Sequence, residues 1–287
     1  MAHVHHFSYG LLTPVCAYLM SFVGSFLGLL CTSRARASTG RSRASWLALA
    51  ALAIGGTGIW VMHFIAILGF SISGMQIRYD VPITLLSCLA AVVVVAVGLF
   101  IVGFGGSGTP VIVTAGVIMG IGVVSMHYSG MAAMRMSGHI GYQPGLVALS
   151  VVIAVVASTV ALWFCLRAKG SWETAGAALI MGVAVTGMHY TGMAAMRVTM
   201  DGNAGATGGA DPIDFLLPLI GGIAVVSTTL LIIIAMAPSE DEIHADRALQ
   251  ERLRSLQEGG SRAAPRPGDA PPPARTAGEW FGGGPSR

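Results

Sequence analysis

Seven long apolar stretches dominate this sequence and leave it few ways to fold. They lie near residues 8–31, 46–70, 82–104, 110–134, 145–167, 174–197 and 213–237. Each reaches the length of about 20 residues that a helix needs to cross a bilayer. Only 10% of the residues are charged, against roughly 25% in soluble domains. Because a spanning segment must satisfy its own backbone hydrogen bonds, we predict an all-α, polytopic membrane protein with seven transmembrane helices.

The basic residues predict the orientation of these helices. Thirteen of the 16 lysines and arginines follow the first, fifth or seventh span, and only Arg78, Arg135 and Arg197 lie on the other side. Basic loops stay in the cytoplasm, so we expect a periplasmic N-terminus and a cytoplasmic C-terminus. The first span lacks a basic leader and is too long for a cleaved signal peptide, so we expect it to remain as a helix. The net charge of +3 follows from this topology, and we expect no nucleic-acid partner.

A ten-residue block occurs twice, each time at the end of an even-numbered span. Residues 126–135 read MHYSGMAAMR and residues 188–197 read MHYTGMAAMR, and a weaker copy, MHFIAILGF, begins at Met62. His63, His127 and His189 are 64 and then 62 residues apart, which equals two spans with their loops. A repeat with an even number of helices keeps its orientation. We therefore expect three parallel two-helix repeats plus one extra helix, the seventh, with all three motifs at one face.

The repeated block contains the residue types of a soft-metal site. Residues i and i+4 share a helix face, which pairs His127 with Met131 and His189 with Met193, and the next methionine continues that face at i+7. Thioethers favour Cu(I), while imidazole accepts Cu, Zn, Fe or Ni, so copper is the first choice. The predicted metal ligands are Met62, His63, Met126, His127, Met131, Met134, Met188, His189, Met193 and Met196.

Two features qualify this metal site. The first copy has Ile67 where the others have methionine, so His63 is expected to contribute an imidazole and nothing more. A ligating histidine usually donates its other N–H to a neighbour, and Tyr128, Tyr190, Ser129 and Thr191 are the candidate partners. For any single copy the alternative is a histidine that caps a helix or bonds a neighbour, but three copies at one depth favour the metal site.

Cysteines and the C-terminal segment give less information. Cys16, Cys31, Cys88 and Cys165 lie in or beside apolar spans without a CxxC pair, which favours small apolar filling over a disulfide or thiolate site. We divide the chain into a membrane domain at 1–237, a cytoplasmic amphipathic helical stub at 238–258 and a disordered tail at 259–287. Ser239 and Glu242 can cap the stub. Its narrow apolar seam consists of Ile243, Leu249, Leu253 and Leu256.

The blocks MHYSGMAAM and MHYTGMAAM, with the weaker MHFIA, resemble the MHYT family of bacterial integral-membrane sensor domains over roughly residues 1–237. This resemblance implies a location in the bacterial inner membrane and copper coordination by the Met and His residues near the outer face. It also implies sensing of a diatomic gas such as oxygen, carbon monoxide or nitric oxide. Family members often carry a cytoplasmic cyclase, phosphodiesterase or kinase domain. This chain continues only into a short charged tail, so we expect a separate cytoplasmic signalling partner.

Two functions fit these observations. In the first, the metal, or a gas bound to it, changes how the motif helices pack, and the last span transmits this change to the tail. In the second, the same cluster takes up, stores or delivers copper without any signalling. An enzyme is not expected, because the sequence shows no paired carboxylates, no nucleophile–base arrangement and no phosphate-binding loop.

Overall fold

The computed structural model describes residues 4–5, 8–72, 76–200, 208–238 and 240–263. It forms two compact units, Met1–Glu240 and Asp241–Arg287. Within these residues, the first unit contains seven helices long and apolar enough to cross a membrane, which confirms the prediction of an all-α polytopic protein. These spans are α1 (Leu12–Ala37), the composite second span α2 (Gly40–Ala51), η1 (Leu52–Val61) and α3 (Met62–Leu68), then α4 (Val81–Gly105), α5 (Thr109–Ala132), α6 (Pro144–Arg167), α7 (Gly170–Ala194) and α8 (Pro212–Met236).

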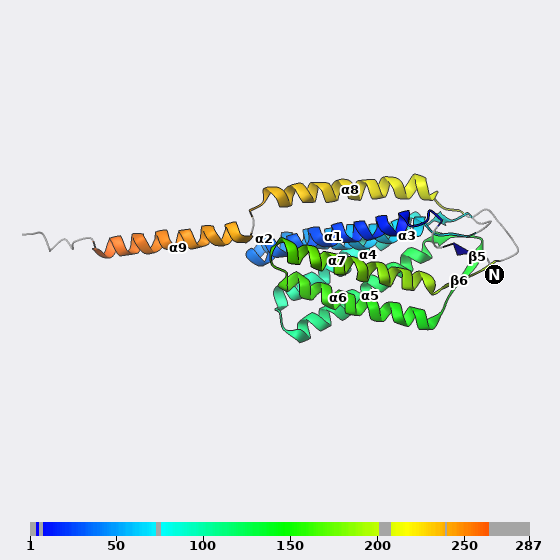
Figure 1. Cartoon of the computed structure of the whole chain (residues 1–287), viewed down its shortest axis with the longest axis horizontal. Helices are drawn as coiled ribbons and strands as arrows, with labels where there is room; N and C mark the ends of the chain where they lie inside the picture. Colours follow the sequence, from blue (N-terminus) through cyan, green and yellow to red (C-terminus); the bar gives the residue numbers. More distant parts are fainter. Residues whose placement is uncertain (1–3, 6–7, 73–75, 201–207, 239, 264–287) are drawn as a thin grey trace, which may run out of the picture. The chain divides into compact units, whose positions relative to one another are not determined.

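The first six spans pack in a closed ring. Contacts run from α1 to the second span, on to α4, α5, α6 and α7, and back to α1. The motif-bearing spans therefore alternate with the others around the ring. The seventh span, α8, lies outside it against η1 and α1, along the edge of the bundle in Figure 1.

Glycine allows the spans of the ring to approach closely. A Cβ atom added to Gly24 of α1 would lie 2.2 Å from the backbone nitrogen of Gly58. One added to Gly120 of α5 would lie 2.6 Å from the Cα of Val155. Small residues serve this purpose in membrane helices generally. On the outside, large apolar side chains such as Leu86, which is 65% exposed, are placed to face lipid.

The second span is not a regular α-helix throughout. Residues Leu52–Val61 form a π-helix, η1, that contains Gly55, Gly56 and Gly58 and ends just before Met62 and His63. Its residues from Ala53 to Val61 are buried. Extended π-helix is rare, and π-type turns are frequent at functional sites.

Three short antiparallel sheets lie at the ends of the motif helices. They pair β1 (Val4–His5) with β2 (Ser71–Ile72), β3 (Arg78–Tyr79) with β4 (Met134–Arg135), and β5 (Gly138–Tyr142) with β6 (Met196–Met200). Two backbone hydrogen bonds repeat the same link: Asp80 N–H donates to Ala133 O at 2.9 Å, and Gln143 N–H donates to Ala195 O at 2.8 Å. The segment before α4 or α6 is thus fixed to the end of the next motif helix.

At the opposite end of the bundle, two arginines of α1 hold helix C-termini. Arg34 Nη2 donates to Ile234 O at 2.6 Å and to Ala237 O at 3.2 Å, at the end of α8. Arg36 donates to Cys165 O and Ala168 O, at the end of α6. Cations are favourable at helix C-termini because of the helix dipole.

The four cysteines are free thiols.

The second unit contains the helix α9 (Glu240–Ala263). Leu249, Leu253 and Leu256 are all exposed on it. The helix continues to Ala263, past the end at 258 that the sequence predicts. The predicted cap at Ser239, the side chain of Ile243 and the tail from 264 onward lie outside the described residues.

Candidate metal centre

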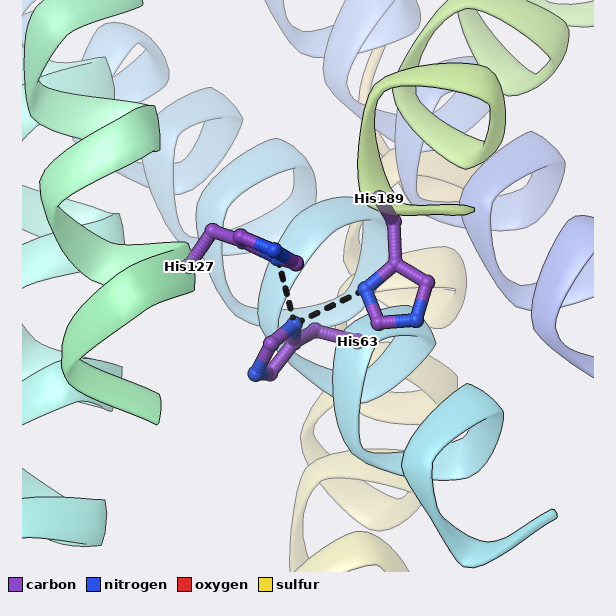
Figure 2. A group of neighbouring side chains, drawn as sticks. All are labelled: His63, His127 and His189. Atoms are coloured by element: carbon purple, nitrogen blue, oxygen red, sulfur yellow. Dashed lines mark hydrogen bonds between the residues drawn. The ribbon is translucent and has the colours of Figure 1, made fainter. Parts of the chain in front are cut away.

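Three histidines from separate spans meet at one point in the ring. Figure 2 shows His63 of α3 between His127 of α5 and His189 of α7. The Nδ1 atom of His63 lies 3.0 Å from Nδ1 of His189 and 3.1 Å from Nδ1 of His127. One nitrogen from each ring lies within 4.8 Å of the other two. The group therefore has the spacing of a site that can hold a metal ion.

The three copies contribute to this cluster in nearly the same way. The ring centroids are 4.9, 4.9 and 5.1 Å apart, with the planes 77–87° to one another. Each ring also meets the aromatic ring of the next residue, Phe64, Tyr128 or Tyr190, edge-on at 4.9–5.0 Å. The weak first copy thus supplies an imidazole equivalent to the other two.

The cluster does not satisfy its own hydrogen-bonding groups. All three histidines are at most 1% exposed, and their Nε2 atoms have no hydrogen-bond partner. Three neutral imidazoles bring three N–H donors and three acceptor lone pairs. Only two hydrogen-bond contacts join the rings, and the same Nδ1 atom of His63 takes part in both of them. Buried polar groups without partners are costly and call for an explanation. A metal at the centre would use nitrogen lone pairs that otherwise face one another, so the donor set fits a metal ion.

The methionines beside the histidines are buried in the same helices. Met131 and Met193 lie in the last turns of α5 and α7, at 0% and 2% exposure. Met62, Met126 and Met188 directly precede the histidines and are at most 2% exposed. Metal ligation by these five sulfur atoms stays a prediction.

Met134 and Met196 are not on the helices. α5 ends at Ala132 and α7 at Ala194, and the two methionines lie in β4 and β6, opposite Tyr79 and Tyr142. The expectation that they continue the helical face at i+7 is therefore wrong. The reason is the pairing of each chain segment with the preceding loop, which ends the helix. Both side chains are buried, and their role as ligands stays a prediction.

Three of the four expected partners of the histidines form hydrogen bonds with other oxygen atoms. Ser129 donates to Met126 O at 2.9 Å and Thr191 to Gly187 O at 2.8 Å. The Tyr128 hydroxyl lies 3.0 Å from Ser150 Oγ. For Ser129, Thr191 and Tyr128 the predicted role is wrong, because nearer oxygens compete for their hydroxyl groups.

Sequence reasoning missed the polar contacts at the motif end. Arg135, which in the sequence indicates only the orientation, donates from Nε to Asp80 Oδ2 at 3.1 Å and pairs with it through Nη2. Arg197 donates in the equivalent way to Gln143 Oε1 at 2.8 Å. The hydrogen bond from Arg135, followed by that from the Ile83 N–H, lowers the pKa of the Asp80 carboxyl group. Asp80, the acidic residue immediately before α4, is the sequence feature from which this contact could have been predicted.

Three segments of the chain match one family model, MHYT, described as a bacterial signalling protein N terminal repeat. The matches cover residues 56–115, 120–178 and 182–243. Each unit begins in or close to a motif span and runs through the following one, so the third includes α8 and α1 precedes the first. The period of the repeat agrees with the prediction. The predicted repeats, however, started one span earlier, with the first span, and left the seventh span out. In the ring itself, α1 occupies the place next to α7.

Curated relatives share this region. The bifunctional diguanylate cyclase/cyclic di-GMP phosphodiesterase MucR of Pseudomonas aeruginosa is 36% identical over 240 residues, 82% of this chain and 35% of that protein. The cyclic di-GMP phosphodiesterase NbdA of the same organism is 36% identical over 190 residues, 64% of this chain and 24% of that protein. The signaling protein YkoW of Bacillus subtilis is 30% identical over 203 residues, 68% of this chain and 25% of that protein.

The chain thus spans about a quarter to a third of the length of the curated relatives that it matches. No solved structure matches it. The three matched repeats cover more than half of the sequence, and the multi-pass membrane protein described here therefore belongs to the MHYT family of bacterial signalling proteins.

Proposed function

We propose that the helix ring is the sensor domain of a signalling protein and that it binds a metal ion through His63, His127 and His189. The observation that carries this proposal is the convergence of three buried imidazoles, whose Nδ1 atoms lie together and whose Nε2 atoms have no hydrogen-bond partner. Ionisable side chains within a membrane domain are costly and usually functional. Three of them from alternate spans, each in the same repeated motif, form a built site.

Copper, as Cu(I), is the proposed metal. Imidazole accepts several transition metals, so the choice rests on charge and on the nearby sulfur. The group of three histidines includes no carboxylate or thiolate, and the electrostatic cost of burying an ion grows with the square of its charge. A monovalent ion is therefore easier to hold here than a divalent one. Met131 and Met193, buried one helical turn away, are soft groups that suit the same ion.

A diatomic gas is the proposed signal. Three protein ligands leave part of a metal's coordination shell open for a small molecule. Oxygen, carbon monoxide and nitric oxide are small enough to reach a buried site through the apolar interior. The metal's chemistry would supply the binding of the gas, while the protein supplies the three imidazoles and excludes water.

Signalling is proposed to leave the membrane domain through α8. This span follows the third motif helix and leads to α9, whose exposed leucines can contact a cytoplasmic partner. The motif end of the bundle would face the periplasm of the inner membrane, and α9 the cytoplasm. The matched relatives are named for cyclic di-GMP turnover or for signalling. These names favour a sensor over a protein that only delivers copper, with no enzymatic activity in the membrane domain itself.

Metal analysis of the detergent-purified protein tests the site. We expect stoichiometric copper in the wild type and loss of most of it in His127→Ala and His189→Ala, because two imidazoles hold an ion far less well than three. The matched control is His139→Ala, since His139 lies exposed in β5 outside the cluster. Equal metal content in all four proteins would remove the metal site.

A further inference from the structure

Two glycines of the repeated motif lie directly against the imidazole of the neighbouring copy. A Cβ atom added to Gly130 would lie 2.4 Å from Nε2 of His63, and one added to Gly192 would lie 2.3 Å from Nε2 of His127. In both cases the next nearest atoms are Cδ2 and Cε1 of the same ring. Each ring is therefore pressed, through its Nε2 edge, against the backbone of the next motif helix.

The same contact is repeated around the ring in one direction. The histidine of α3 meets the glycine of α5, and the histidine of α5 meets the glycine of α7. The corresponding residue of the first copy, three positions after its histidine, is Ala66. Ala66 is 2% exposed and belongs to a small cluster against which Tyr190 packs. The first copy thus carries a methyl group at this motif position, whereas the second and third copies carry none.

These contacts replace the hydrogen bond that usually orients a ligating histidine. Such a histidine normally donates its second ring N–H to a carboxylate, a carbonyl or water. Here the three Nε2 atoms have no hydrogen-bond partner, and for His63 and His127 the space beside Nε2 is filled by helix backbone. An ion at that edge of either ring would compete for space with the helix backbone, while the Nδ1 atoms converge on the centre of the cluster.

We infer that Gly130 and Gly192 are positioning residues of the metal centre, which hold His63 and His127 so that the metal is bound through Nδ1. The inference rests on the proposed metal binding. A methyl group at either glycine would begin about 1 Å closer to the ring than the 3.4 Å of an ordinary contact. The ring must then move, and its Nδ1 atom leaves the position it shares with the other two.

The test compares Gly130→Ala and Gly192→Ala with Gly187→Ala. Gly187 is the matched control, because it precedes His189 by two residues in α7 and a Cβ atom there meets nothing within 4 Å. Purified full-length proteins are titrated with Cu(I) against a competing chelator, and thermal unfolding verifies that each is folded. We expect affinity about 10- to 100-fold weaker in the first two variants, the loss typical when the support of a ligating histidine is removed, and no change in Gly187→Ala.

Solid-state NMR of the labelled histidine rings provides a readout that a purely structural role would not move. In wild type we expect a contact between Gly130 Cα and the His63 ring with or without metal, and ¹⁵N shifts that place Cu(I) on Nδ1. In Gly130→Ala the His63 ring signals should shift, and in Gly187→Ala they should not. These wild-type spectra also decide the matter if an alanine variant fails to fold.

The outcomes separate the two proposals. If wild type binds no Cu(I), the proposed function fails, and the Gly130–His63 contact and the variant shifts in metal-free protein still test the positioning. If wild type binds Cu(I) but both alanine variants match Gly187→Ala, or the metal sits on Nε2, the positioning role is overturned.

Discussion

At the scale of single residues, Asp80 links two elements at the motif end. Its Oδ1 accepts from the Ile83 N–H at 3.1 Å and so caps α4, while Oδ2 accepts from Arg135 of β4. Both contacts favour the ionised carboxylate, and the bond from Arg135 is the larger cause of its lowered pKa. A carboxyl group whose pKa is lowered by folding stabilises the folded state above its unfolded pKa. That stability is lost as the pH falls through the lowered value.

We expect Asp80→Asn to weaken the acid sensitivity of the protein. Asparagine still caps the helix but cannot titrate, so the loss of stability that we expect for wild type below about pH 4, the ordinary aspartate range, should be smaller. Thermal unfolding between pH 3 and 7 measures this. The control is Asp211→Asn, since Asp211 caps α8 through the Ile213 N–H. An acid limb as steep in Asp80→Asn as in wild type would contradict the assignment.

The three clustered histidines were predictable from sequence, whereas their surroundings were not. Spacing and motif placed His63, His127 and His189 at one depth, and the structure brings them together. Which ring nitrogen faces inward depends on side-chain rotation against neighbouring helices, which no periodicity records. Met134 and Met196 were misplaced because the helix end is set by a backbone bond from a distant loop.

At the scale of elements, α8 is attached to the ring by few polar contacts. Within the membrane Thr57 of η1 lies 2.6 Å, Oγ1 to Oγ, from Ser227 of α8. Ser227 already donates to Ile223 O, so Thr57 is the donor. A cavity of about 60 Å³ adjoins this bond between η1, α4 and α8. The bond thus joins the span that carries His63 to the span that leads toward α9.

Thr57→Val is expected to loosen α8 in its middle. The variant keeps the shape of the side chain but removes the donor, at a cost of about 0.6 kcal/mol, the average for such bonds between membrane helices. Hydrogen exchange around Ser227 should become faster. The matched control is Thr228→Val, since the Thr228 hydroxyl is exposed and bonds only within α8, to Ala224 O. Equal exchange in both variants would show that the link does not hold α8.

The long helices were predictable and the shorter elements were not. Length and hydropathy locate a span whatever its neighbours do, and the seven spans begin and end within six residues of their predicted ends. The winding of η1 depends on close packing, because a Cβ atom at Gly55 would lie 2.7 Å from Ala91 O. Strands of two residues such as β3 and β4 are too short to show an alternating pattern.

At the scale of the whole molecule, the ring closes with a helix from outside the matched repeats. The family units take in α8, but α1 fills the place between α7 and the second span. The 62- and 64-residue spacing fixes the period and is the same for both frames. Only packing decides which helix closes the ring. The sequence could therefore predict the length of the repeat, but not which spans belong to each repeat.

Cysteine labelling tests the proposed orientation. In a variant whose four native cysteines are replaced, we expect His139→Cys to react with a membrane-impermeant maleimide in intact spheroplasts. Lys169→Cys, between α6 and α7 at the opposite end, should react only after lysis. Both positions are exposed, so accessibility alone does not separate them. The reverse pattern would place the histidine cluster beside the cytoplasm.

The π-helix immediately before Met62 has a geometric consequence for the whole domain. A π-type turn contains one more residue than an α-turn, and each residue of an α-helix advances the rotation by about 100°. Rewinding the turn of η1 that precedes Thr57 as α-helix would rotate His63 by about that angle and take it out of the histidine cluster. It would carry Thr57 away from Ser227 in the same movement. One change of winding therefore reaches both the imidazole cluster and the outlying seventh span.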